Sequence, residues 1–127
     1  MYNRLKSLLN NSYSPYYNFP VSAIVVMKDG NTFEGVNVEN ANGTSICAER
    51  HAIGAAIAHG YKKGDFKSIY VMLSNGEFGT PCFACRQVIL EFFKKDDKVI
   101  SVNSEGEEKE FTVGELCPYP FDSEDLK

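Results

Sequence analysis

The chain has 127 residues, a length typical of one domain, and 43% of them are apolar while 24% are charged. A domain of this size buries roughly two thirds of the surface that its unfolded chain exposes, so it needs no disulfide or metal merely to fold. The longest apolar runs, such as residues 23–27, are far shorter than the ~20 residues of a membrane span, and the N-terminus lacks the pattern of a signal peptide. We therefore expect one globular domain over residues 1–127 that remains in the cytoplasm and binds no membrane.

The charge pattern argues against a nucleic-acid partner. The formal net charge is −4, from 13 basic and 17 acidic residues. Proteins that bind nucleic acid usually gather basic residues on one face, because contacts to phosphate dominate their affinity. The basic residues here are scattered, as in the pairs Lys62-Lys63 and Lys94-Lys95. A small molecule is the better candidate for a ligand.

Hydrophobic spacing and turn signals define the expected elements. Leu5, Leu8 and Leu9 recur at helical spacing, Asp29-Gly30-Asn31 is a hairpin signal between β-branched runs, and Gly60 is a plausible C-cap. The expected elements are a helix at 1–11, an aromatic loop at 13–20, strands at 21–28 and 32–38, a helix at 47–59, a strand at 67–74, a helix at 81–94, strands at 98–103 and 109–113, and a short acidic helix at the end.

This order of elements predicts an α/β fold. The first two strands form a hairpin, and helical crossovers connect the strands in the middle of the chain. We therefore expect a mixed five-stranded sheet covered by helices on both faces, in three layers.

Three of the four cysteines occupy positions suited to metal binding. Cys82 and Cys85 are three residues apart, so on a helix they share one face, and Cys47 begins the preceding helix. Helix N-termini favour a thiolate over a thiol, and a cluster of soft sulfur ligands selects zinc. We expect one zinc ion per chain held by these three residues. Cys117 has no partner in the sequence and is expected to be a packing residue.

The residues around the cysteines indicate catalysis rather than structural zinc. A structural zinc has four protein ligands, whereas a catalytic zinc has an open position for water. No fourth ligand is expected here. Neither His51, four residues beyond Cys47, nor His59, at the end of the same helix, is expected to bind the metal. Glu49 lies two residues beyond Cys47, where it can act as an acid and base on the water. Arg50 and Arg86 each follow a motif residue and are expected to offset the net negative charge of three thiolates on Zn²⁺.

The pattern of a ligand, one residue, a glutamate and a later P-C-x-x-C is typical of zinc-dependent deaminases of nucleobases. Beyond these motifs, the chain resembles the cytidine deaminase family over nearly its whole length, and its small, tetrameric, three-cysteine branch fits best. The segments that carry the resemblance are residues 13–16 (YSPY), 19–21 (FPV), 35–40 (GVNVEN), 46–50 (ICAER), 85–88 (CRQV), 116–121 and 123–126 (SEDL).

The resemblance implies roles for five further residues. Phe19 would place its ring against the pyrimidine, and Asn37 and Glu39 would bind the ribose hydroxyl. The Ala48 backbone, together with Glu49, would contact the base. Phe121 would reach the pocket of a neighbouring subunit in a homotetramer.

The expected activity is therefore the hydrolytic deamination of cytidine and deoxycytidine. Two departures from the family pattern keep an alternative open: residues 41–43 (ANG) lack the usual aromatic in a loop about one residue shorter, and Phe83 replaces the usual glycine. That alternative is a deaminase of a related aminopyrimidine nucleoside, such as blasticidin S. A third possibility, a non-catalytic zinc-stabilised binding domain, is disfavoured by Glu49 and by the missing fourth ligand.

Overall fold

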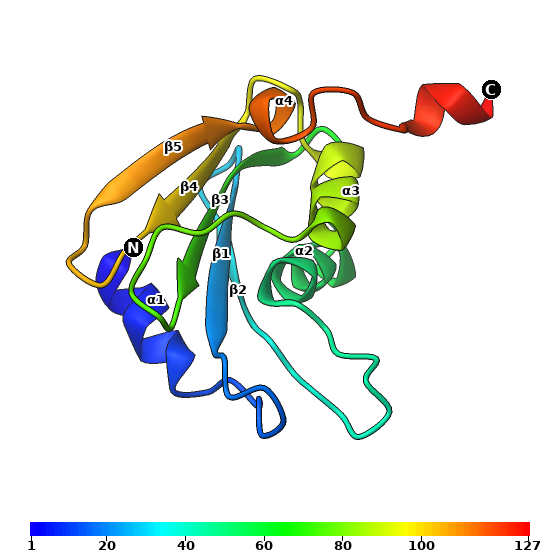
Figure 1. Ribbon diagram of the computed structural model, residues 1–127. Helices are drawn as coiled ribbons and strands as arrows, with labels where there is room; N and C mark the ends of the chain where they lie inside the picture. The colour runs from blue at the N-terminus through cyan, green and yellow to red at the C-terminus, as the bar shows by residue number, and fades with distance from the viewer.

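The chain forms one five-stranded sheet with helices around it (Figure 1). The structure is a computed structural model that describes residues 1–127. Its elements are α1 (Tyr2–Leu9), β1 (Val21–Met27), β2 (Thr32–Val36), α2 (Ala48–Ala58), β3 (Phe66–Leu73), α3 (Phe83–Phe92), β4 (Lys98–Val102), β5 (Glu108–Thr112), α4 (Val113–Leu116) and a terminal 3-10 helix η1 (Ser123–Leu126).

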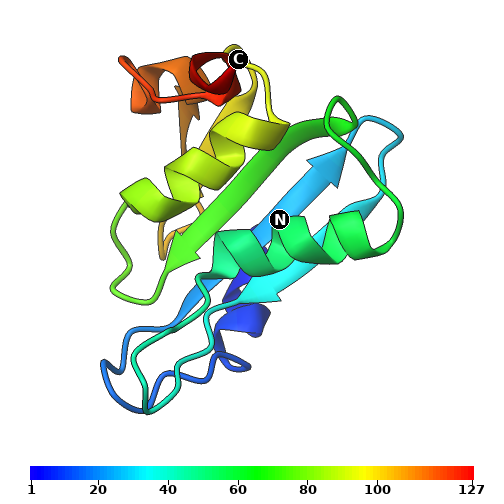
Figure 2. The ribbon, with the colours of Figure 1, turned by 90° about the vertical axis from the view of Figure 1, so that its right-hand side faces the viewer.

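The sheet is mixed, as the order of elements predicts. The strand order is β2-β1-β3-β4-β5, in which β3 and β4 are parallel and every other pair is antiparallel. The crossover between the two parallel strands contains α3, and α2 connects the hairpin to β3. Both of these helices therefore begin at the same end of the sheet (Figure 2).

Helices cover both faces of the sheet, which confirms the predicted three layers. The larger core lies between the sheet and α2, α3 and α4, and it includes Ile53, Phe66 and Ile89. A smaller core lies under α1 on the opposite face, where Leu5 packs against Ile24 and Ile100. None of the helices is long and apolar enough to cross a membrane.

The close approach of α2 to β2 depends on a glycine. A Cβ atom on Gly35 would overlap the carbonyl oxygen of Ala48 and the amide nitrogen of Ala52. The small residues Ala48, Ala52 and Ala56, four apart on α2, are fully buried against the sheet. The helix that begins after Cys47 is therefore seated directly on the strand that precedes Asn37.

The structure differs from the predicted elements near the C-terminus and at two boundaries within the chain. The last strand is followed at once by α4, which the sequence analysis did not predict, and the expected acidic helix is one 3-10 turn. The predicted helix at 81–94 begins later, because Cys82 is its N-cap and Pro81 lies in the preceding loop. The second strand ends at Val36, and Val38 instead forms isolated bridges to Tyr13 and Ile46.

Candidate active site

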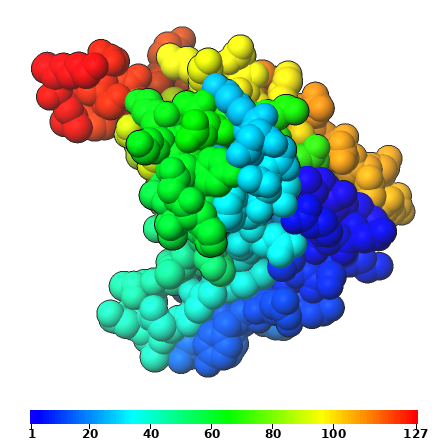
Figure 3. Space-filling model, turned by 180° about the vertical axis from the view of Figure 1, so that it is seen from behind, coloured from blue at the N-terminus to red at the C-terminus, as the bar shows by residue number.

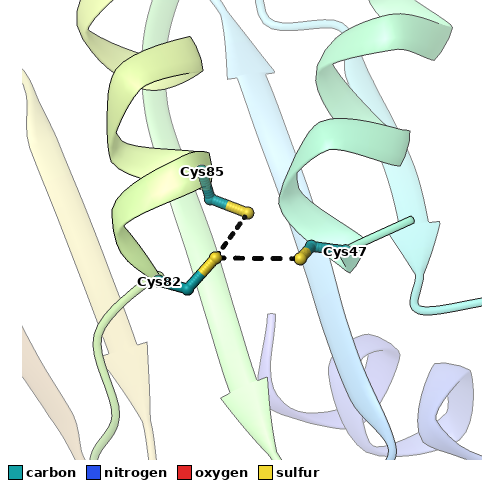
Figure 4. A group of neighbouring side chains, drawn as sticks. All are labelled: Cys47, Cys82 and Cys85. Atoms are coloured by element: carbon teal, nitrogen blue, oxygen red, sulfur yellow. Dashed lines mark hydrogen bonds between the residues drawn. The ribbon is translucent and has the colours of Figure 1, made fainter. Parts of the chain in front are cut away.

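Three thiol groups converge at the starts of α2 and α3 (Figure 4). The Sγ atoms of Cys47 and Cys82 are 3.8 Å apart, those of Cys82 and Cys85 are 3.5 Å apart, and all three lie within 4.8 Å of one another. Tetrahedral coordination with Zn–S bonds of about 2.3 Å requires sulfur atoms ~3.8 Å apart. The predicted cysteines therefore have both the chemistry and the spacing of a zinc site with one open position.

The local electrostatics favour a thiolate at Cys47. Its interaction with the side chain of Cys85 and a hydrogen bond from the Arg50 guanidinium lower the pKa of Cys47 to about 5, against the opposing effect of burial. The same interaction with Cys47, together with burial, raises the pKa of Cys85. Both cysteines that begin a helix, Cys47 and Cys82, are also in the positive field of its N-terminus. A bound cation would favour the thiolate form of all three groups.

Glu49 is buried next to the thiol cluster. It belongs to the first turn of α2 and is 4% exposed, and burial raises the pKa of its carboxyl group to about 7. A carboxyl group with a pKa near neutrality can both accept and donate a proton. Its position agrees with the acid and base role predicted from the sequence.

Glu49, Cys47 and Cys82 line one cavity of about 330 Å³. This volume is at the lower end of the range of small-molecule sites, about 300–1,000 Å³. The cavity also contains all but one of the residues expected to bind substrate. Its lining residues are Tyr17, Phe19, Val21, Asn37, Glu39, Ser45, Ile46, Cys47, Ala48, Glu49, Leu73, Thr80 and Cys82.

Glu39 has one carboxylate oxygen available to a ligand. Its Oε1 accepts hydrogen bonds from the backbone amides of Tyr16 (2.8 Å) and Tyr17 (3.3 Å), while its Oε2 has no partner within the chain. The residue is 7% exposed and lies in the cavity wall. Its backbone partners hold the carboxylate in a fixed orientation.

Asn37 is hydrogen-bonded mainly to the protein. Its Oδ1 accepts from the Val21 amide (2.8 Å) and from the Ser12 hydroxyl (2.5 Å), and its Nδ2 donates to the Phe19 carbonyl oxygen (2.9 Å). One N–H of the amide is left for a ligand. The side chain therefore also fixes Phe19, the aromatic residue expected to contact the base.

The two arginines have different roles. Nη2 of Arg50 lies 3.5 Å from the Cys47 sulfur, so this guanidinium can offset thiolate charge as expected. The Arg86 guanidinium contacts none of the three clustered sulfur atoms: it donates to the carbonyl oxygens of Pro81 (2.7 Å) and Leu116 (3.0 Å) and to the Thr80 hydroxyl (2.8 Å). The Arg86 side chain therefore connects the start of α3 to α4, and its expected charge-offsetting role stays a prediction.

Two aromatic residues singled out by the sequence lie outside the cavity. Phe83 is 79% exposed at the start of α3, and the Arg86 guanidinium lies 4.5 Å from its ring centroid. Its ring does not line the cavity. Phe121 is 59% exposed in the C-terminal segment and does not reach the cavity of its own chain. The expected contact of Phe121 with a neighbouring subunit remains a prediction.

His51, His59 and Cys117 have structural roles and are not part of the metal-binding group. Nδ1 of His51 lies within hydrogen-bond distance of the backbone of Val36, and Nδ1 of His59 lies 2.8 Å from the Ala55 carbonyl oxygen. Neither belongs to the metal-binding group. Cys117 packs against the larger core.

Several cavity residues were not anticipated from the sequence. Val21 and Leu73 are paired at the ends of β1 and β3, and Thr80 precedes the P-C-x-x-C motif. Val21 and Leu73 could have been found by noting that the ends of their strands lie beside the starts of the helices. Nothing in the sequence set Tyr17 apart from the other aromatic residues of its loop.

A second, larger hollow of about 420 Å³ lies at the other end of the sheet, beside Asp29, His59 and Asp65. Its carboxylates already have partners: Asp29 accepts from Tyr61 (2.7 Å), and Asp65 accepts from the Lys62 amide (2.8 Å). It contains none of the thiol groups. The smaller cavity beside the cysteines is therefore the candidate active site.

Similarity to known proteins agrees with this geometry. A family model described as the cytidine and deoxycytidylate deaminase zinc-binding region matches residues 1–103. The cytidine deaminase of Halalkalibacterium halodurans is 41% identical over 116 residues, which cover 91% of this chain and 86% of that protein. That of Sporosarcina psychrophila is 38% identical over 122 residues, which cover 95% and 88%.

Solved structures give the same result. The crystal structure of cytidine deaminase from Burkholderia pseudomallei superposes with a TM-score of 0.88 at 39% identity and covers 94% of each chain. The crystal structure from Mycobacterium leprae has a TM-score of 0.78 at 33% identity, with 93% of this chain and 94% of that chain covered. With the zinc-binding region matched and the three thiols and Glu49 brought together, the chain belongs to the cytidine deaminase family.

Proposed function

We propose that this protein hydrolyses cytidine and deoxycytidine to uridine and deoxyuridine with release of ammonia. One observation carries the proposal: a buried carboxyl group, Glu49, shares a cavity of nucleoside size with a cluster of three thiols that leaves one metal position open. A non-catalytic zinc domain has no use for a carboxyl group buried beside its metal-binding thiols.

Cys47, Cys82 and Cys85 hold the zinc ion, which when bound acts as a Lewis acid and lowers the pKa of water towards 7. Glu49 then performs the proton transfers. Its carboxylate accepts one proton of the attacking water and delivers it to N3 of the pyrimidine while the oxygen adds to C4. It next accepts the second proton of that oxygen and delivers it to the amino group, which leaves as ammonia. One water is consumed, and the carboxylate is regenerated.

The cavity walls provide the contacts for a nucleoside. The Phe19 ring is placed to pack against the pyrimidine, and the backbone of Ala48 borders the same space. Glu39 offers its free Oε2, and Asn37 its remaining N–H, to a hydroxyl group of the sugar. A carboxylate at this position repels a phosphate group, which favours nucleosides over nucleotides.

We further propose that the active form is a homotetramer in the cytoplasm. Tyr119 and Phe121 are exposed aromatic residues in a C-terminal segment that projects from the body of the chain (Figure 3), a geometry suited to contact with another copy. Three metal-binding thiols must stay reduced, which suits a reducing compartment.

A panel of free nucleosides, with zinc measured on the same sample, tests the proposed function. Cytidine and deoxycytidine should be converted by protein that contains about one zinc per chain. Absence of turnover on every cytosine nucleoside by zinc-loaded protein would contradict the proposal.

A related aminopyrimidine nucleoside such as blasticidin S is the second candidate substrate. A hollow of about 200 Å³ adjoins the cavity, shares Tyr17, Glu39 and Ser45 with it, and continues along the shortened loop past Ala41. This space would accept a larger substituent on the sugar. The same panel should therefore include blasticidin S, and a higher kcat/KM for it than for cytidine would favour this candidate.

A further inference from the structure

Ser101 is a buried polar side chain among apolar neighbours. It lies on β4 and is 1% exposed. Because side chains alternate along a strand, Ser101 shares a face of the sheet with Val99, which belongs to the larger core, as does Val71, the residue paired with Ser101 on β3. A buried hydroxyl group is costly unless it is hydrogen-bonded, so the partner of Ser101 indicates what this residue does.

That partner is the backbone amide of Gly79, which donates to Oγ of Ser101 over 2.9 Å. Gly79 belongs to the segment that connects β3 to α3. A Cβ atom on Gly79 would overlap Cδ1 and Cγ of Leu73, so the backbone lies directly against that side chain, which lines the substrate cavity. The connecting segment is therefore held at Gly79 between a hydroxyl group of the sheet and a wall residue of the cavity.

From this point the connecting segment leads directly into the metal site. Thr80 and Cys82 line the cavity, and Cys82 is the N-cap of α3, with its sulfur 3.8 Å from that of Cys47 (Figure 4). Arg86 holds the middle of the segment, because its guanidinium donates to the Thr80 hydroxyl and to the Pro81 carbonyl oxygen. Arg86 itself belongs to α3, so these bonds fasten the segment only to the helix that it begins.

The bond to Ser101 differs because it joins the segment to the sheet. Among the hydrogen bonds of residues 79–82, it is the one whose partner lies on a strand. The other helix of the site is also seated on the sheet, through the close contact of Gly35 with Ala48. The two helix starts that carry the metal ligands are therefore placed relative to one another through the sheet.

We propose that Ser101 is a positioning residue for the metal site: its hydroxyl group holds the Gly79 amide and thereby fixes Cys82 relative to the ligand on α2. This inference rests on the proposed function in that the site it supports is the catalytic one, but it concerns the retention of zinc and not the substrate. Groups that orient metal ligands contribute to metal affinity, and a less ordered segment must be ordered again each time its ligand binds. Loss of the hydroxyl group should therefore speed the release of zinc.

A pair of buried serines tests this role against general support of the fold. Ser101→Ala should release zinc to a chelating dye about two- to tenfold faster than the wild type, as expected for the loss of a hydrogen bond of ordinary net strength. Ser22→Ala is the matched control, because Ser22 on β1 is also fully buried and donates to the Leu5 carbonyl oxygen (2.8 Å), on the opposite face of the sheet.

Both alanine variants should lower the midpoint of denaturant unfolding, since each loses a buried hydrogen bond. Only Ser101→Ala should change the rate of zinc release, and Ser22→Ala should match the wild type. Equal rates of release from the two variants would overturn the proposal, because zinc retention would then not depend on the hydroxyl group beside the connecting segment.

A second pair of variants separates the hydroxyl group from the volume of the side chain. Threonine and valine have nearly the same shape, but only threonine offers an oxygen to the Gly79 amide. Ser101→Thr should therefore release zinc more slowly than Ser101→Val. Equal release by these two variants would also overturn the positioning role.

The rate of zinc release is measured without a nucleoside, on protein purified with its zinc, so it does not depend on turnover. Faster release from Ser101→Ala than from Ser22→Ala supports the positioning role even if the wild type converts no nucleoside, an outcome that would refute only the proposed function. Conversely, turnover of cytidine by the wild type together with unchanged zinc release from Ser101→Ala would refute only the positioning role.

Discussion

The backbone of Gly35 on β2 lies directly against the carbonyl oxygen of Ala48, the first residue of α2. The atoms that would meet a side chain at position 35 are backbone atoms, which cannot rotate away. Because Ala48 stands between Cys47 and Glu49, this contact sets how closely both functional groups approach the sheet.

Gly35→Ala should therefore destabilise the protein and lower its activity. Forcing extra atoms into a close-packed contact costs about 1–3 kcal/mol, and relief requires α2 to move with its functional groups. Denaturant unfolding measures the loss of stability, and kcat/KM measures how far the movement of α2 lowers the activity.

Gly54→Ala is the matched control, because Gly54 is an exposed residue of the same helix with nothing within 4 Å of its added Cβ. Alanine in a helix interior is favoured by roughly 0.5–1 kcal/mol over glycine, so this variant should be slightly more stable than the wild type. Equal behaviour of the two variants would show that α2 accommodates a side chain at position 35.

Cys85→Ser should lose most of the bound zinc. Cys85 is fully buried, and a serine hydroxyl replaces the soft thiolate ligand by a weak one of similar size. Cys117→Ser, a change of the same kind outside the cluster, should keep about one zinc per chain. Elemental analysis of the purified variants decides the matter, and full zinc content in Cys85→Ser would contradict the assigned ligand set.

Glu49→Gln should keep its zinc and lose nearly all activity. The amide fills the same volume but cannot accept the proton of water, and general acid–base catalysis contributes typically 10²–10⁴-fold to a rate. Because one carboxyl group serves both transfers, we expect a loss of kcat near or above the upper end of this range. Turnover close to that of the wild type, with zinc present, would mean that another group carries the proton.

Glu39 should distinguish cytidine from free cytosine. With cytosine in the cavity, Oε2 of Glu39 would be shielded from water without a sugar hydroxyl as its partner, and an unsatisfied buried polar group costs ~1–3 kcal/mol, or about ten- to a hundredfold in kcat/KM. Glu39→Gln keeps an oxygen for the Tyr16 amide, so the loop should remain folded. The ratio of kcat/KM for the two substrates should fall in this variant; an unchanged ratio would exclude a role in sugar binding.

The local part of the site was predictable from the sequence. The three-residue spacing of Cys82 and Cys85, and the two-residue spacing of Cys47 and Glu49, determine geometry within one helical turn each. The mixed sheet and its two covered faces also follow from the order of strands and helices.

Features that depend on distant partners were not predictable. The orientation of Arg86 is set by the Leu116 carbonyl oxygen, 30 residues away, and the neighbouring position of β1 and β3 depends on the packing of the whole sheet. The short helix α4 was missed for a different reason. Thr112 and Glu115 form a capping box, a T-x-x-E signal that is visible in the sequence but lay at the expected end of a strand.

The metal ligands lie at the starts of two regular helices, whereas the outer wall of the cavity is built from connecting segments, among them Tyr17, Ser45 and Thr80. Connecting segments tolerate insertion and substitution far better than the packed elements between them. Changes of length in residues 40–46 can therefore alter which nucleoside fits without moving a sulfur atom or Glu49. Substrate range and reaction chemistry are then separately adjustable in this scaffold, which makes those loops the place to engineer new aminopyrimidine substrates.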